Sequence, residues 1–127
     1  MPQKPSSSPT QFIQGAPVLE VASVEPTVNF FVNSLGFHCD FQSSEYAVVW
    51  RDNAALHFIQ SSDLPRPIRL FYWLVDVNAY YDELKRNGTN ITTEIGDRDY
   101  GIRDFSVTDI NGYILVCLLY TSPSPRD

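Results

Sequence analysis

The sequence predicts an α+β fold in which two βαβββ modules form curved mixed sheets around a cleft. Two stretches share one plan, LEVASVEPTVNFFVNSLGF at residues 19–37 and YWLVDVNAYYDELKRNG at residues 72–88. Each stretch has an apolar strand, a short polar step, an amphipathic helix and a final glycine. Three short strands follow each helix. Repetition of this kind indicates duplicated units, and each curved sheet needs a partner that covers its apolar face.

The first module is expected over residues 14–61. Apolar side chains recur at helical spacing from Val28 onward, which predicts a helix after the first strand. Pro26 suits the first helical turn because its missing N–H is not needed there, and Gly36 suits the position after the helix. The strands HCDFQ, YAVVWRD and AALHFIQ follow, and a turn at residues 52–53 joins the last two.

The second module is expected over residues 68–120, after a linker, SSDLPRP, at residues 61–67. Asp76 is a suitable N-cap because its carboxylate can accept a hydrogen bond from a free N–H of the first turn. Gly88 ends the predicted helix. The strands TTEI, RDFSVTD and YILV follow, and the Asn-Gly pair in the turn at residues 110–112 is typical of a hairpin.

The two ends of the chain differ in composition from its middle. Residues 1–13 are rich in Pro, Ser and Gln, which predicts a disordered N-terminal arm. CLLYTSPSPRD, residues 117–127, resembles the read-through translation of a transposase sequencing adapter, a string that recurs at the ends of metagenomic open reading frames. On this interpretation the natural chain continues differently after Val116, although the apolar residues 117–120 can still complete a strand. A natural Pro/Ser tail is the alternative.

The overall charge restricts the class of partner. The 127 residues carry a formal net charge of −6, and the pI is near 4.7. Nucleic-acid binding needs basic patches, so this balance argues against it and is compatible with a cationic ligand. No apolar run reaches the length of a membrane span, and MPQKPSSSPTQ has no signal-peptide core, so we expect a cytoplasmic protein without membrane contact. The two cysteines have neither metal-ligand nor disulfide-framework spacing.

The repeated plan resembles the vicinal oxygen chelate superfamily, which includes glyoxalase I, extradiol dioxygenases, fosfomycin-modifying enzymes and bleomycin-binding resistance proteins. The resemblance lies in APVLEVASVEPTVNFFVNSLGFHCDF, YAVVWRDNAALHFI and TEIGDRDYGIRDFSVTDINGY, which together run from Ala16 to about Val116. Within the superfamily the chain most resembles the bleomycin resistance proteins. The resemblance implies one domain over residues 14–120, which binds and sequesters bleomycin-type glycopeptides without modifying them and so gives antibiotic resistance.

The resemblance also places the metal ligands of the superfamily's enzymes. Three of these positions fall on Ala16, Arg69 and Val116, whose side chains cannot coordinate a metal ion. Only His57 offers a donor, so we expect no bound metal, no cofactor and no catalysis. His57 is then either part of the cleft lining or an ordinary strand histidine. A metal-dependent enzyme of the glyoxalase, dioxygenase or thiol transferase type, and a binder of another planar cationic natural product, remain the alternatives.

The family's stacking aromatics correspond to Tyr46, Tyr72 and Tyr100, and Tyr100 stands directly before Gly101. Bleomycins carry a flat bithiazole and a cationic tail, so aromatic rings and carboxylates are the expected lining. Each carboxylate has the alternative of being ordinary solvated surface. The candidate acidic residues are Asp40, Glu45, Asp63, Asp97, Asp99 and Asp104.

The strand IRLFYWLV leaves one choice open, because side chains alternate between the two faces of a strand. Tyr72 lies on one face and Trp73 on the other. By its place in the family pattern we predict that Tyr72 faces the cleft, with Trp73 as the alternative.

The resemblance finally implies a homodimer with two drugs held in clefts at its interface. Family members exchange their first strand between subunits, and a proline stands at the hinge. Proline fixes φ and stiffens such a crossover. We therefore predict that residues 16–22 are exchanged between two copies, with Pro17 as the hinge.

Overall fold

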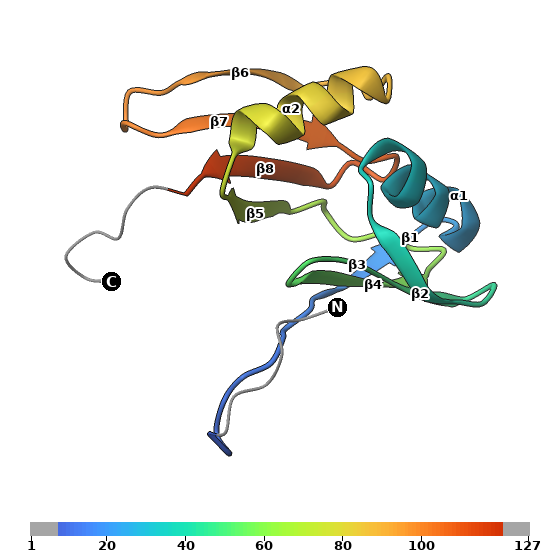
Figure 1. Cartoon of the computed structure of the whole chain (residues 1–127). Coiled ribbons are helices and arrows are strands. Elements are labelled where there is room, and N and C mark those ends of the chain that lie inside the picture. Colours follow the sequence, from blue (N-terminus) through green and yellow to red (C-terminus); the bar gives the residue numbers. More distant parts are fainter. Residues whose placement is uncertain (1–7, 121–127) are drawn as a thin grey trace. The chain divides into compact units, whose positions relative to one another are not determined.

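The computed structural model describes residues 8–120 (Figure 1). The chain divides into two compact units, which we call unit 1, ending at Arg66, and unit 2, beginning at Pro67. The division lies at one end of the linker expected at residues 61–67. That the two units make one functional domain over residues 14–120 stays a prediction. We describe each unit by itself.

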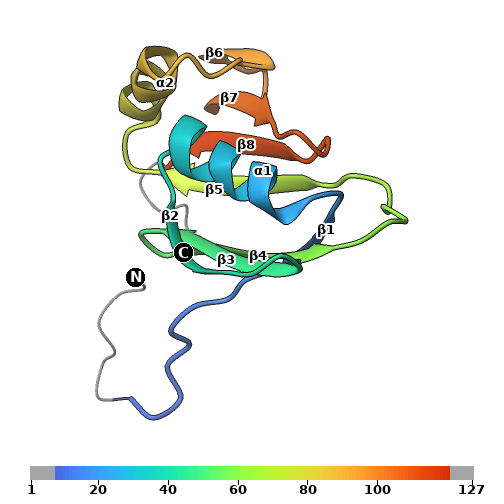
Figure 2. The same ribbon diagram turned by 90° about the vertical axis from the view of Figure 1, so that its right-hand side faces the viewer.

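Unit 1 has the expected βαβββ order and forms one four-stranded mixed sheet, sheet 1. The strands lie in the order β1-β4-β3-β2, with β1 parallel to β4 and the other neighbours antiparallel. The helix α1 packs on β2, β3 and β4, as Figure 2 shows. The elements are β1 (Val18–Val21), α1 (Val24–Asn29), η1 (Phe30–Ser34), β2 (His38–Gln42), β3 (Tyr46–Arg51) and β4 (Ala54–Gln60).

The helix of unit 1 begins as predicted but changes its winding. Pro26 lies in the first turn of α1, and Gly36 follows the helix with a φ of 77°. From Phe30 the helix is a π-helix, in which the N–H of Leu35 donates to the carbonyl of Phe30 at 3.3 Å. Phe31 and Leu35 are both buried, and the Phe31 ring lies 5.0 Å from that of Phe58 on β4. The wider turn therefore accompanies the burial of both side chains.

Unit 2 repeats this architecture in sheet 2. The strands lie in the order β5-β8-β7-β6, with β5 parallel to β8 and the other neighbours antiparallel. The helix α2 packs on β7 and β8 (Figure 1). The elements are β5 (Arg69–Leu74), α2 (Val77–Arg86), β6 (Thr93–Asp97), β7 (Arg103–Thr108) and β8 (Ile114–Leu119). The two modules predicted from the repeat are thus confirmed as two sheets of identical strand order.

The ends of α2 match the sequence signals. The Asp76 side chain accepts a hydrogen bond from the N–H of Ala79 at 3.0 Å, which satisfies one free donor of the first turn. Gly88 follows the helix with a φ of 77°, a conformation that an L side chain rarely adopts. On its buried side α2 meets Phe105 of β7, whose ring centroid lies 5.2 Å from that of Tyr81.

The last described residues complete sheet 2. The strand β8 extends through Cys117 and Leu118, which are both buried, to Leu119. The expectation that residues 117–120 still complete a strand is confirmed as far as Leu119, whatever their origin. At the other end, residues 8–13 are exposed and form no helix or strand. The remaining parts of the predicted arm and tail, residues 1–7 and 121–127, lie outside the described residues.

The two thiols are expected to differ strongly in reactivity. Cys39 is exposed on β2, whereas Cys117 is buried and burial raises the pKa of its thiol from 9.0 to about 12. Because the thiolate is the reactive form, a thiol reagent at pH 8 should modify Cys39 rapidly and Cys117 only after denaturation. Time-resolved titration with an aromatic disulfide reagent checks this. The variant Cys39→Ser should lose the fast phase, and two equally fast thiols in the parent would contradict the burial.

Candidate ligand-binding faces

The face of sheet 1 turned away from α1, its distal face, carries Tyr46 and His57. Tyr46 pairs with Ile59, and His57 pairs with Val48 on one side and Val18 on the other, so these side chains share that face. The Tyr46 hydroxyl is hydrogen-bonded to Nδ1 of His57. Their rings meet edge to face, with centroids 5.5 Å apart. The half-buried Tyr46 ring is therefore held in one orientation beside the imidazole.

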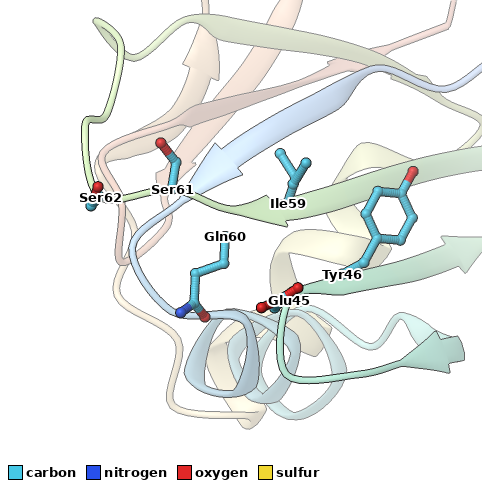
Figure 3. A pocket seen from close by; sticks show the side chains of 6 residues that line it. All are labelled: Glu45, Tyr46, Ile59, Gln60, Ser61 and Ser62. Atoms are coloured by element: carbon cyan, nitrogen blue, oxygen red, sulfur yellow. The ribbon is translucent and has the colours of Figure 1, made fainter.

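A pocket of about 540 Å³ opens at the end of this hairpin. Figure 3 shows the Tyr46 and Ile59 side chains on one side of the two strands and the Gln60 side chain on the other. Among the lining residues, Glu45 supplies a carboxylate and Ser61 and Ser62 supply hydroxyl groups. A ring, a carboxylate and hydroxyl groups are suited to an amine or a sugar. The lining residues are Glu45, Tyr46, Ile59, Gln60, Ser61 and Ser62.

The positions at which the family resemblance predicts metal ligands lie within the described residues of each unit. Ala16 is exposed and precedes β1, and the carbonyl of the next residue, Pro17, accepts a hydrogen bond from the N–H of His57 at 3.0 Å. In unit 2, Arg69 pairs with Ile114, so Arg69 shares one face of the sheet with Val116. Among residues 8–120, no three His, Cys, Asp or Glu side chains lie close enough together to hold a metal ion.

The register of sheet 2 places Tyr72 and Trp73 on opposite faces of the sheet. Tyr72 pairs with Cys117, which pairs with Phe105, and Phe105 packs against α2. Tyr72 therefore lies on the side of the sheet that the helix covers. Trp73 pairs with Leu118 on the opposite side, which we call the distal face of sheet 2. This register favours the alternative, Trp73, and which of the two faces a ligand stays a prediction.

The surroundings of the two side chains agree with this register. Tyr72 is half-buried, and burial, together with the nearby Cys117, raises the pKa of its hydroxyl to about 12. Trp73 is 59% exposed and Phe71, two residues before it on the same face, is 49% exposed. Two large aromatic rings thus stand partly in solvent on the distal face of sheet 2.

The stretch EIGDRDYGIRDF forms the hairpin between β6 and β7, and its acids are largely paired. The Arg103 guanidinium donates to both carboxylate oxygens of Asp97, at 2.9 and 3.0 Å, and these hydrogen bonds lower the pKa of that carboxyl. Arg98 Nε donates to Asp104 at 2.7 Å. Asp97 and Asp104 therefore each have an arginine partner already, and their part in binding a cationic ligand stays a prediction.

Tyr100 stands at the tip of this hairpin with its ring 62% exposed. Its hydroxyl donates a hydrogen bond to Asp104, which raises the pKa of the phenol. Gly101 follows with a φ of 83°, a turn conformation that favours glycine. The Tyr100 side chain is therefore largely exposed to solvent, while its hydroxyl is hydrogen-bonded to Asp104.

The remaining predicted acids are solvent-exposed. Asp40 lies at a register shift in β2, Asp63 lies in the loop after β4, and Asp99 lies beside Tyr100. Glu45 is exposed at the rim of the pocket described above. Their part in binding stays a prediction, and so does that of His57 and Gly101.

Three residues of these faces were not singled out from the sequence. Phe71 could have been found, because strand alternation places it on the same face as Trp73. Arg98 and Arg103 stand within the acidic stretch itself, and each lies six residues from the carboxylate that it pairs with, Asp104 and Asp97 respectively. The alternating signs were the signal that the acids would be paired rather than free.

Comparison with known protein families gives one match over most of the chain. The profile described as "Glyoxalase/Bleomycin resistance protein/Dioxygenase superfamily" matches residues 15–116. A search of curated proteins finds no match. No helix within residues 8–120 is long and apolar enough to cross a membrane.

Solved structures with the same fold include a bleomycin-binding protein, a bleomycin resistance determinant and a glyoxalase-related enzyme. The bleomycin-binding protein from bleomycin-producing Streptomyces verticillus, complexed with copper(II)-bleomycin, is 24% identical, with a TM-score of 0.70 over 90% of this chain and 99% of that chain. The bleomycin resistance determinant encoded on the transposon Tn5 is 19% identical, with a TM-score of 0.76 over 87% and 100%. A glyoxalase-related enzyme from Clostridium phytofermentans is 18% identical, with a TM-score of 0.71 over 90% and 100%. At these identities the likeness establishes the fold.

Proposed function

Because the chain belongs to the glyoxalase/bleomycin resistance protein/dioxygenase superfamily, we propose that it binds and sequesters a bleomycin-type glycopeptide antibiotic without modifying it. The proposal includes a homodimer in which residues 16–22 are exchanged about Pro17. A cytoplasmic location, expected from the sequence, belongs to the same proposal. In the single chain described here β1 pairs with β4 of its own chain.

The observation that carries the proposal is a set of exposed rings in unit 2, two on the distal face of sheet 2 and one at the tip of the β6–β7 hairpin. Phe71, Trp73 and Tyr100 are each about half exposed or more, although large aromatic side chains are usually mostly buried in soluble domains. Large exposed apolar groups that lie close together mark binding surfaces. A flat heteroaromatic system that stacks on such rings gains roughly 0.5–1.5 kcal/mol beyond the burial of its area.

The distal face of sheet 1, in unit 1, offers a second kind of contact. Tyr46 presents a ring of fixed orientation, and Glu45 supplies a carboxylate at the same pocket. A protonated amine beside a ring face and a carboxylate is stabilised by both. The net charge of −6 favours approach of a cation in the same way. A bithiazole is the kind of group that suits the exposed rings of unit 2, and a cationic amine is the kind that suits the pocket of unit 1.

A titration with copper-loaded bleomycin tests the proposal. We expect heat in calorimetry, a change in tyrosine and tryptophan fluorescence at micromolar protein, and recovery of the drug with unchanged mass. Light scattering on the same sample should give the mass of two chains. Absence of heat and of any fluorescence change would rule out this ligand, a changed drug mass would rule out pure sequestration, and a one-chain mass would remove the exchanged dimer.

The second candidate is a metal-dependent enzyme, which the likeness to a glyoxalase-related enzyme favours. Three positions argue against a metal-dependent enzyme, because by the family resemblance they should carry lone-pair donors for a metal ion. These positions hold the methyl group of Ala16, the guanidinium of Arg69 and the isopropyl group of Val116. Metal analysis of the purified protein distinguishes the two. About one tightly bound Ni, Zn, Fe or Mn per chain would favour the enzyme.

A further inference from the structure

The exposed ring of Tyr100 is fastened through its hydroxyl to a buried carboxylate. Asp104 lies on β7 and is only 6% exposed. One carboxylate oxygen accepts from the Tyr100 hydroxyl, and the other accepts from Nε of Arg98 at 2.7 Å. Both oxygens of Asp104 are therefore occupied by groups of the same hairpin. Its carboxylate is a structural centre of the loop rather than a contact for a ligand.

Arg98 completes this arrangement by crossing from one strand to the other. Its Nη2 donates to the carbonyl of Glu94 at 2.6 Å and to that of Asp104 at 3.0 Å. The side chain lies close over Gly96, where an added Cβ would stand 3.1 Å from Nη1. The absence of a side chain at Gly96 thus leaves the space that the guanidinium occupies.

The backbone of the turn is held as well. The N–H of Arg98 donates to the carbonyl of Ile102 at 3.0 Å, and the N–H of Gly101 donates to that of Arg98 at 2.9 Å. Tyr100 is consequently anchored on both sides, by the turn at its backbone and by Asp104 at its hydroxyl. An exposed tyrosine without such bonds samples several rotamers.

From this geometry we propose that Asp104 is a positioning residue that holds Tyr100 as a preformed stacking surface for a flat, heteroaromatic part of the ligand. The inference rests on the proposed function for its ligand. Since the hydroxyl is already bonded to Asp104 and the carboxylate is neutralised by Arg98, the ring face is the group left for contact. The ring of Tyr100 then favours ligands with a flat ring system. Preference for a cationic ligand has to come from carboxylates other than Asp104.

Preorganisation has a measurable consequence. Ordering one side chain on binding costs an amount equivalent to about a two- to tenfold loss of affinity, and a ring that is ordered beforehand avoids this loss. Tyr100→Phe keeps the ring but removes its anchor, so it should bind copper-loaded bleomycin about two- to tenfold more weakly. Asp104→Asn keeps an oxygen that can accept from the phenol and should lie between the parent and Tyr100→Phe.

A matched control exists in the same unit. The Tyr81 hydroxyl on α2 also donates to a carboxylate, that of Glu94, but Tyr81 packs on the helix-covered side of sheet 2. Tyr81→Phe removes an equivalent bond and should leave the affinity unchanged. Equal weakening in both variants, or unchanged affinity in Tyr100→Phe, would overturn the positioning role.

A measurement without ligand separates this inference from the proposed function. The titration of Tyr100 is obtained by subtracting the absorbance titration curve of Tyr100→Phe from that of the parent. The pKa of Tyr100 in this difference curve should be above the ordinary pKa of a tyrosine because its hydroxyl is bonded to Asp104. Asp104→Asn removes the negative charge. The difference curve between Asp104→Asn and the double variant that also carries Tyr100→Phe should give a pKa for Tyr100 closer to the ordinary value. An identical titration in both proteins would show that Asp104 does not hold the ring. If the titrations differ but the parent binds no bleomycin, the proposed ligand is wrong and the positioning of the ring stands.

Discussion

Replacing Trp73 with alanine is expected to weaken the binding of copper-loaded bleomycin by at least about tenfold, equivalent to about 1.4 kcal/mol. Trp73 is a large ring, 59% exposed on the distal face of sheet 2, and tryptophan is among the residues that most often dominate binding energy. Because the side chain stands largely outside the core, its removal should leave the free energy of unfolding nearly unchanged. Calorimetric titration of the variant, with a denaturation curve as a check on folding, measures both.

Tyr72→Phe is the matched control for this experiment. Tyr72 is the neighbouring aromatic residue on the helix-covered face, and the variant removes only its hydroxyl. We expect an affinity within about twofold of the parent, since a residue under α2 does not touch a ligand on the opposite face. The reverse result, a weakened Tyr72→Phe and an unchanged Trp73→Ala, would restore the placement expected from the family pattern.

The largest loss of stability is expected from Phe105→Ala, which should lower the free energy of unfolding by about 3–5 kcal/mol. Phe105 is fully buried under the rings of Tyr80 and Tyr81 on α2 and lies beside Cys117 of the neighbouring strand β8. Truncation of this side chain leaves a cavity between α2 and sheet 2, which the surrounding residues fill only in part. Urea denaturation followed by circular dichroism measures the change.

Phe12→Ala is the control, because Phe12 is 96% exposed in the segment before β1. Its effect should stay within about 0.5 kcal/mol. Typical domains are stable by only about 5–15 kcal/mol, so Phe105→Ala can fall below the threshold for folding. Phe105→Leu, which leaves less empty volume, then supplies the measurement. A loss below about 1 kcal/mol in Phe105→Ala would contradict the central position of this ring.

Most of the fold could be predicted because its signals are local. The apolar spacing of the helices, the glycines after them, the Asp76 cap and the Asn-Gly turn act within a few residues, and each appears where the sequence placed it. The π-helical turn at Phe30–Ser34 was not predicted. Helical spacing fits either winding over so short a stretch, and the difference depends on how the buried rings meet the sheet.

The sequence by itself determined the duplication, the order of helices and strands along the chain, and the family resemblance. These features depend on the order and spacing of residue types along the chain. Only the tertiary structure decided which side of β5 the helix α2 covers. The alternation of side chains along a strand assigns residues to two faces but does not show which face is covered. It also decided the state of the acids in EIGDRDYGIRDF. Asp104 could have remained exposed, but the hairpin brings it to Arg98 and Tyr100, and a buried carboxylate is stable only when its charge is paired.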